Sequence, residues 1–365
     1  MHKMQSRFVE LDFFRGLVLL IIVVDHIGGS ILSRITLHAY ALCDAAEVFV
    51  FLGGFATATA YAALTQRHSE SAAQQRFLRR ALEIYRAFLV TAGLMLLVSA
   101  ALIAFSIDAP NLTTTDLTDL ATSPAAVLRD ILLFRRQPYL ASVLPMYAAF
   151  ALMVPVLLPL ARNRPWLLVA GSIALWAVAP FLYAYLPTAS GTHWDFNPLA
   201  WQLLFVLGII ARCQPVYPSL SAARHGWLLS GLALAIVVAA ASYKLFLEQG
   251  VPESSLKQNL AWLRVVNFLA IAWLLAHLIR FGWISRLARW LPWVGLIGRK
   301  SLLCFIAGAV ISLVVDSLLH TATRGYLNLP LGLVADAIAV GALVLVASAA
   351  EPMKRLFSLH VKTSG

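Results

Sequence analysis

The chain has 365 residues, of which 61% are hydrophobic and only 12% are charged, and its mean hydropathy is +0.81. A soluble domain carries about 25% charged residues, so this composition excludes a water-soluble globular fold and predicts an integral membrane protein. The formal net charge of +11 does not indicate nucleic-acid binding, because the basic residues lie at the ends of apolar runs, as they do in membrane proteins.

Apolar windows of about 20 residues, the length that crosses a bilayer core of ~30 Å, recur along the chain. We therefore predict an all-α, polytopic integral membrane protein with about ten transmembrane helices, forming a single membrane domain over residues 1–365. The predicted spans lie near residues 11–32, 46–66, 84–107, 140–161, 165–187, 197–212, 226–247, 261–281, 299–320 and 331–351. The first is expected to stay uncleaved, because no clear small-x-small cleavage site follows it.

The basic residues predict which side of the membrane each loop faces. Lys and Arg crowd every second loop, as in "RRALEIYR" (79–86) and "GRK" (298–300), whereas the intervening loops hold few. Cytoplasmic loops carry the excess of positive charge, so both termini are predicted to be cytoplasmic. The longest outer loop, 108–138, contains the amphipathic stretch "PAAVLRDILLF", which suits a position on the membrane surface.

The first span, "ELDFFRGLVLLIIVVDHIGGS", contains Asp12, Arg15, Asp25 and His26. An ionisable residue inside a span costs roughly 2.5–3.5 kcal/mol, so each should face the helix bundle and have a partner. Arg15 and His26 are about three helical turns apart and lie on one stripe, ~16 Å from each other along the axis, whereas Asp25 faces another neighbour. These three residues are catalytic candidates. The alternatives are an Arg15 that extends to the cytoplasmic headgroups and a His26 that is a packing residue.

Asp44 and Glu47 lie three residues apart at the start of the second span, on one helical face. The short preceding loop makes the first two helices antiparallel neighbours. Either carboxylate can therefore orient the His26 imidazole or raise its basicity, with Glu47 as a catalytic candidate and Asp44 as a binding one. The alternatives are a helix N-cap for Asp44 and a structural role for Glu47.

Further polar residues lie at the predicted outer side of the membrane. Arg135 and Arg136 end the long outer loop, and His193 and Trp194 lie at the mouth of the sixth span. All four are candidates for binding a substrate, and the histidine and tryptophan can stack on a sugar. For the histidine and tryptophan, an interfacial aromatic belt is the alternative.

Inside the eighth span, Arg264 and Asn267 share one face within "LRVVNFLAIAW" and are predicted to contribute to substrate binding. A buried guanidinium needs acceptors, and Asp316 or Asp336 of the last two spans can supply them.

Several stretches, in order, resemble a known family. "ELDFFRGLVLLIIVVDHIGG" followed by "DAAEVFVFLGGF" is similar to the start of the OpgC family, which succinylates osmoregulated periplasmic glucans. "LPMYAAFALMVPVLLPL", "FNPLAWQLLFVLG", "LRVVNFLAIAW" and "GRKSLLCF" follow in the family's order, so the resemblance covers nearly the whole chain. The wider acyltransferase type-3 group shares an Arg/Lys-x10-His signature in the first helix, which Arg15 and His26 fit. The chain departs from that group after Phe305, where "IAGAV" contains no histidine.

The resemblance implies an acyl-CoA-dependent O-acyltransferase of the bacterial inner membrane, with His26 as an essential catalytic residue. Succinyl-CoA or acetyl-CoA would be the cytoplasmic co-substrate and a periplasmic glucan or other glycan the acceptor, with membrane lipid around the protein and no nucleic acid as partner. His26 can act as a general base or carry the acyl group as an acyl-imidazole, and Arg15 can pair with a phosphate or carboxylate of the donor.

No permanently bound cofactor and no metal are predicted. Cys43, Cys213 and Cys304 lie in or beside apolar segments and have no CxxC or Cys/His spacing, so a disulfide framework or a zinc site is not expected.

A proton-coupled transporter of an anionic or lipid-linked solute is the alternative from another functional class. Asp25, His26, Glu47, Asp316 and Asp336 would form its proton relay. Against it, the sequence shows neither internal repeats nor interrupted helices at mid-membrane.

Overall fold

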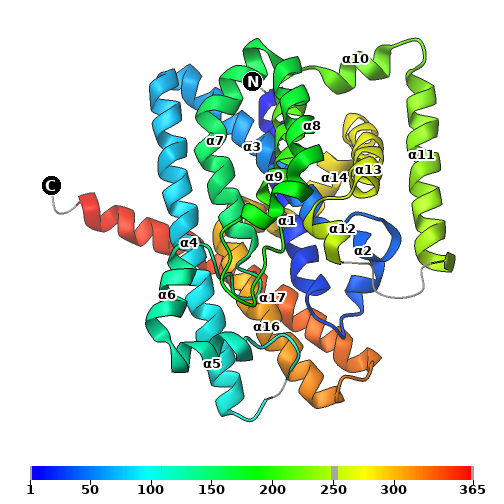
Figure 1. Cartoon of the computed structure of the whole chain (residues 1–365). Coiled ribbons are helices and arrows are strands. Elements are labelled where there is room, and N and C mark those ends of the chain that lie inside the picture. The colour runs from blue at the N-terminus through cyan, green and yellow to red at the C-terminus, as the bar shows by residue number, and fades with distance from the viewer. Residues whose placement is uncertain (1, 108, 248–253, 363–365) are drawn as a thin grey trace. The chain divides into compact units, whose positions relative to one another are not determined.

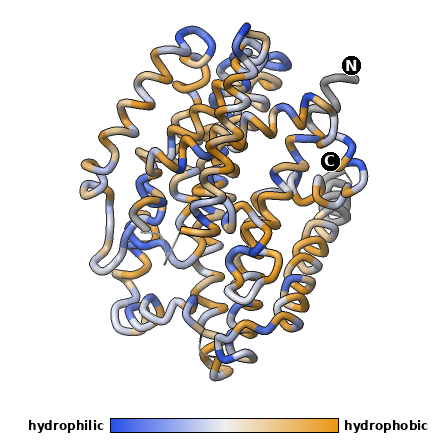
Figure 2. The backbone as a smooth tube through the Cα atoms, turned by 90° about the vertical axis from the view of Figure 1, so that its right-hand side faces the viewer, coloured by the Kyte–Doolittle hydropathy of each residue, from blue (hydrophilic) through white to orange (hydrophobic). Residues whose placement is uncertain are grey.

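The computed structural model describes residues 2–107, 109–247 and 254–362, and the side chains of 9–107, 109–247 and 256–350. Within these ranges the regular secondary structure is helical, without strands (Figure 1). Apolar residues colour most of the length of the long helices in Figure 2, as expected for helices in contact with lipid. The ends of the chain, predicted to be cytoplasmic, are residues 1 and 363–365 and lie outside the described residues.

Among the described residues, eight helices are long and apolar enough to cross a membrane. They are α3 (Ala45–Arg67), α4 (Glu70–Ala104), α7 (Val143–Asn163), α8 (Pro165–Leu182) continued to Tyr185, α11 (Gly226–Ser242) continued to Leu247, α13 (Trp262–Arg280), α16 (Ser301–Thr323) and, over Leu329–Ala350, α17 (Leu329–Lys362). A ninth results if α9 (Pro198–Cys213) and α10 (Val216–Ala222), which are bent by 71° at their junction, form one span. The predicted all-α, multi-pass membrane fold is confirmed, with eight or nine such helices in the described ranges rather than ten.

The first predicted span differs most from the structure. Helix α1 (His2–Asp25) is not among the eight, because charged residues recur along it, and it ends at Asp25 rather than near residue 32. Turns follow, and then the short 3-10 helix η1 (Leu32–Ile35). Gly28 and Gly29 lie in these turns, where glycine's helix penalty of about 1 kcal/mol favours an end to the helix. His26 is therefore the first residue beyond α1.

Shorter helices connect the long ones. They are α2 (Leu37–Tyr40), α5 (Thr114–Thr122), α6 (Pro124–Leu132), η2 (Tyr183–Tyr185), the π-helical η3 (Tyr243–Leu247), α12 (Ser254–Gln258), α14 (Trp283–Trp290) and α15 (Pro292–Arg299). By its internal contacts the chain divides into two compact units. Unit 1 comprises Met1–Thr36, Leu102–Asn111 and Phe281–Gly365, and unit 2 comprises Leu37–Ala101 and Leu112–Arg280.

In unit 1, α1 packs closely on α15 through a pair of glycines. A Cβ atom on Gly16 would lie 1.9 Å from the carbonyl oxygen of Val294, and one on Gly298 would lie 1.8 Å from that of Asp12. Small residues of this kind let two helix backbones approach within a membrane. Gly298 therefore fixes the crossing of α1 and α15, and this crossing positions Asp12 and Arg15 beside the start of α16.

Unit 2 contains a crossing of the same type between α3 and α9. A Cβ on Gly54 would lie 2.0 Å from the carbonyl oxygen of Phe205, and one on Gly208 would lie 2.1 Å from that of Phe51. The stacked rings of Phe150 and Phe205, with centroids 4.9 Å apart, continue this core towards α7. The short helix α9 is thus built into the interior of unit 2, which agrees with the prediction of a real helix at 197–212.

Replacing Gly208 by alanine should destabilise the protein by about 1–3 kcal/mol, because the new methyl group meets a backbone carbonyl that cannot rotate away. The matched control is Gly93→Ala in α4, where a Cβ meets nothing within 4 Å. That control should be neutral or slightly stabilising, since alanine is the better helix former. Thermal unfolding of the detergent-solubilised variants measures both, and equal midpoints for the two would contradict the proposed close crossing.

Candidate functional site

His26 lies at the carboxyl end of α1, and its ring contacts the last turn of that helix. Its Nδ1 is 2.7 Å from the carbonyl oxygen of Ile22. A carbonyl oxygen only accepts hydrogen bonds, so Nδ1 carries the proton and the lone pair of the neutral ring is on Nε2. This tautomer has the basic nitrogen that proton abstraction or nucleophilic attack requires. The terminal carbonyls of α1 also favour positive charge on the ring during such a step.

Arg15 lies in the middle of the same helix, and its guanidinium donates to the hydroxyl of Ser301, the first residue of α16. One helical turn earlier, Asp12 lines a cavity of about 320 Å³ together with Arg299. The remaining lining residues are Val9, Phe13, Ala288, Pro292 and Gly295. Arg15 therefore has a specific contact within unit 1, and a cavity with both an acidic and a basic residue lies beside its helix.

Asp25, whose partner the sequence left open, accepts a hydrogen bond from the hydroxyl of Thr36 at 2.8 Å. The intervening residues are held by Asp316 of α16 and Asp336 of α17, both of which accept hydrogen bonds from residues 28–32. Sequence reasoning missed this role of the two aspartates. The sequence feature that could have indicated this role is the position of both aspartates inside apolar helices, because a carboxylate there requires hydrogen-bond donors nearby.

In unit 2, Asp44 and Glu47 form the start of α3, as the N-cap alternative predicted. The Asp44 carboxylate accepts from the Ala46 amide at 2.8 Å, and Glu47 accepts from the Asp44 amide at 2.9 Å, which together make a capping box. The two carboxylates thereby satisfy backbone donors that the first turn of a helix leaves without partners.

Arg264 of α13 bridges the same two carboxylates. Its Nε donates to Glu47 Oε1 at 2.6 Å, and its Nη2 donates to Asp44 Oδ2 at 3.2 Å. Lys257 lies 2.8 Å from Asp44. Burial acts to raise the pKa of the Asp44 carboxyl, but the cations of Lys257 and Arg264 outweigh it and hold that pKa below its usual range.

The prediction that Asp316 or Asp336 would supply the acceptors of Arg264 is therefore wrong. Glu47 and Asp44 supply them, while the carboxylates of Asp316 and Asp336 accept from other donors. The acceptors were misassigned because helical periodicity shows which face of a helix is polar but not which helix packs against that face.

Asn267, on the same face of α13, contacts the segment that leads into α3. Its Oδ1 accepts from the Leu42 amide at 2.9 Å and lies 3.6 Å from Cys43 Sγ. Arg264 and Asn267 together hold residues 42–47, as their shared face implied. Their predicted contribution to substrate binding stays a prediction.

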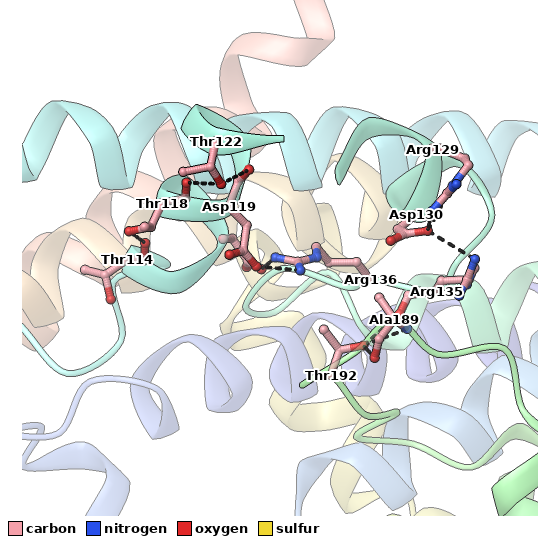
Figure 3. Close-up of polar contacts among 11 residues, drawn as sticks. Thr114, Thr118, Asp119, Thr122, Arg129, Asp130, Arg135, Arg136, Ala189 and Thr192 are labelled. Atoms are coloured by element: carbon pink, nitrogen blue, oxygen red, sulfur yellow. Dashed lines mark hydrogen bonds and ion pairs between the residues drawn. The ribbon is translucent and has the colours of Figure 1, made fainter. Parts of the chain in front are cut away.

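The predicted outer loop contains a second network of charges, drawn in Figure 3. Arg136 is only 7% exposed, and it donates to Asp116 at 2.8 Å and to Asp119 at 2.7 Å. Arg135 lies 3.4 Å from Asp130 and donates to the carbonyl of Thr188. Both arginines thus tie parts of unit 2 together, and a direct role in holding a glycan stays a prediction for each.

His193 and Trp194 differ sharply in exposure. His193 is exposed and lies 3.1 Å from Asp195, whereas Trp194 is 5% exposed and donates its indole N–H to the carbonyl of Pro187 at 2.9 Å. A buried indole offers little ring face to a sugar, so of the two the histidine is better placed for a ligand. Their predicted binding roles remain predictions.

The predicted site residues divide between the two units. Those in unit 1 are Arg15, Asp25 and His26, and those in unit 2 are Asp44, Glu47, Arg135, Arg136, His193, Trp194, Arg264 and Asn267. Within unit 2 the structure brings Asp44, Glu47 and Arg264 into one cluster. His26 belongs to unit 1, whereas Asp44 and Glu47 belong to unit 2. That either carboxylate orients the His26 imidazole therefore stays a prediction.

Comparison with known proteins assigns a family. Residues 7–355, nearly the whole chain, match the family model described as OpgC protein. No curated protein and no solved structure matches the chain. The matched range includes every candidate residue of both units.

Proposed function

The chain belongs to the OpgC family, and on this premise we propose that it transfers an acyl group, expected to be succinyl, from cytoplasmic acyl-CoA to hydroxyl groups of a periplasmic glucan. Family membership makes the chain a transferase, and its apolar helices make it a multi-pass membrane protein. The bacterial inner membrane, with both termini cytoplasmic, is the location this reaction requires. The observation that carries the proposal is the hydrogen-bonded tautomer of His26 in a chain of this family.

The proposed chemistry uses His26 Nε2 as the base. Nε2 takes the proton of a glucan hydroxyl while that oxygen attacks the thioester carbonyl of the donor. The C–S bond then breaks, an ester forms, and the CoA thiolate leaves and receives the proton from the imidazolium. In the two-step alternative, Nε2 itself attacks the thioester and the C–S bond breaks, so that the CoA thiolate leaves. The glucan hydroxyl then attacks the acyl group on Nε2, the N–acyl bond breaks to restore the imidazole, and the hydroxyl proton balances the charge of the CoA thiolate.

Arg15 is proposed to contact the donor. A CoA thioester carries phosphates at its nucleotide end, and the succinyl group adds a carboxylate, so guanidinium groups are suitable partners. Two cations of unit 1 are assigned to the donor. They are Arg15, in the middle of α1, and Arg299, which lines the neighbouring 320 Å³ cavity. The proposed acceptor contacts lie in unit 2, with the exposed His193 as the foremost candidate.

The transporter alternative has less support. A proton relay needs carboxylates that exchange protons with one another, yet Asp25, Asp316 and Asp336 each accept hydrogen bonds from a loop, and Glu47 accepts from an arginine and a helix N-terminus. These are the contacts of carboxylates that hold structure in place.

The test is to incubate the purified protein with radiolabelled succinyl-CoA or acetyl-CoA and a glucan. We expect label to enter the glucan as an alkali-labile ester, with an equal amount of free CoA released. Repeated turnover should require both the donor and the glucan. No CoA release above background with either donor would overturn the proposal. Uptake of a labelled solute into proteoliposomes under a proton gradient, without ester formation, would favour the transporter instead.

A further inference from the structure

In the segment between α1 and α2, some backbone amides donate to backbone carbonyls and others donate to side chains. The amides of Ile27, Ser30, Arg34 and Thr36 each donate to the backbone carbonyl three residues earlier, at 3.2, 2.9, 3.2 and 3.3 Å. The amides of Gly28, Ile31 and Leu32 donate to side chains instead. These side-chain acceptors hold the path of the chain directly after His26.

Asp316 of α16 holds the first part of the segment. Its Oδ1 accepts from the Gly28 amide at 2.8 Å, two residues after His26. Its Oδ2 accepts from the side-chain amide of Asn111 at 2.8 Å. The carboxylate is 6% exposed, so solvent contributes little to this arrangement.

Asp336 of α17 holds the next part and is 2% exposed. Its Oδ1 accepts from the Ser30 hydroxyl at 2.6 Å, and its Oδ2 accepts from the amides of Ile31 and Leu32, both at 2.9 Å. This one carboxyl group therefore contacts three consecutive residues through three hydrogen bonds.

Close packing enforces the same path. A Cβ on Gly332 of α17 would lie 2.5 Å from the carbonyl oxygen of Gly29, and one on Gly29 would lie 2.6 Å from the Leu319 side chain of α16. The segment therefore contacts both helices through backbone that has no room for larger residues. The Thr36 hydroxyl, bonded to Asp25 at 2.8 Å, closes the loop at its far end.

We propose that Asp316 and Asp336 are positioning residues of the transferase site, which fix residues 28–32 and so hold the His26 imidazole in the orientation that acyl transfer requires. The proposal rests on the proposed function. Two buried carboxylates from different helices are directed at one short loop, and that loop begins at the candidate catalytic histidine. Misplacing a catalytic group by about 1 Å can cost 100-fold in rate, so such anchoring has a direct effect on turnover.

The test compares Asp336→Ala with Asp336→Asn. Alanine leaves the amides of Ile31 and Leu32 without an acceptor. Asparagine keeps one oxygen for those two amides and can donate its NH₂ to the Ser30 oxygen, which is also an acceptor. We expect Asp336→Ala to lower kcat by about 10- to 100-fold with KM for acyl-CoA unchanged, and Asp336→Asn to restore kcat to within a few fold of wild type. Ser312→Ala is the matched control, because Ser312 is a buried α16 residue whose hydroxyl donates to the Ala309 carbonyl of its own helix.

Hydrogen exchange of residues 28–32 supplies a readout that does not depend on activity. Exchange should be faster in Asp336→Ala and unchanged in Asp336→Asn and Ser312→Ala, each prepared as a folded, monodisperse protein. Faster exchange with unaltered kcat would overturn the positioning role while leaving the proposed function intact. Loss of kcat in Asp336→Asn equal to that in Asp336→Ala would overturn it too, because charge rather than loop geometry would then matter. A wild-type protein without transfer would instead refute the proposed function itself.

Discussion

Replacing Arg264 by methionine should destabilise the protein by about 3–5 kcal/mol, the usual result of removing one partner from a buried ion pair. Glu47 is fully buried and Arg264 only 14% exposed, so the substitution leaves a carboxylate without its cation where water cannot reach it. Asp44 keeps Lys257, but the start of α3 loses the link to α13. The midpoint of unfolding in a denaturing detergent, compared with that of the wild type, measures the effect.

Two further variants separate the lost ion pair from a general effect of removing an arginine. Arg129→Met removes a guanidinium that is 59% exposed and paired with Asp130, and should change stability by less than about 1 kcal/mol. Adding Glu47→Gln to Arg264→Met removes the unpaired charge and should recover a large part of the loss. If Arg264→Met were no more harmful than Arg129→Met, the buried cluster would not stabilise the fold as described.

The general fold could be predicted because membrane insertion demands long apolar segments, and hydropathy measures those directly. The exact end of a helix depends on weaker local effects, which is why α1 ends at Asp25 rather than near residue 32. The apolar window extended to residue 32 through Ile27, Ile31 and Leu32, although these residues lie in turns and a 3-10 helix. Ile27 is buried, Ile31 is half-buried and Leu32 is exposed, and none of the three is α-helical, so apolar character alone does not predict where the helix ends.

The candidate site could be predicted in part, for similar reasons. The capping role of Asp44 was predictable because the residue types of a capping box leave a short local pattern. The shared face of Arg264 and Asn267 was predictable from spacing, but their partners were not, since spacing within one helix contains no information on its neighbour. The anchoring role of Asp336 was hidden because two of its donors are backbone amides, and every residue except proline has one.

Replacing His26 by alanine should lower kcat by at least 100-fold, within the range of about 10²–10⁴ that general acid–base catalysis contributes. The unfolding midpoint of the variant, compared with that of the wild type, separates a loss of chemistry from a loss of stability. His277→Ala is the matched control, because His277 also has Nδ1 near the carbonyl four residues earlier, that of Trp273, at 3.0 Å. That variant should retain transfer activity. Retained activity in His26→Ala would remove His26 from the mechanism.

Incubating the wild-type protein with labelled donor alone distinguishes the two roles open to His26, and the same two variants serve as controls. In the two-step route, wild-type protein incubated with labelled donor and no glucan should release CoA in a burst stoichiometric with protein and retain the label as a base-labile acyl-imidazole. In the direct route neither burst nor label appears until glucan is added, because the thioester then waits for the hydroxyl whose proton Nε2 accepts. Both routes need the lone pair on Nε2 that the Ile22 hydrogen bond specifies, so His26→Ala should abolish whichever signal wild type gives. His277→Ala should leave that signal unchanged, and a burst that survives in His26→Ala would place the acyl group on another nucleophile.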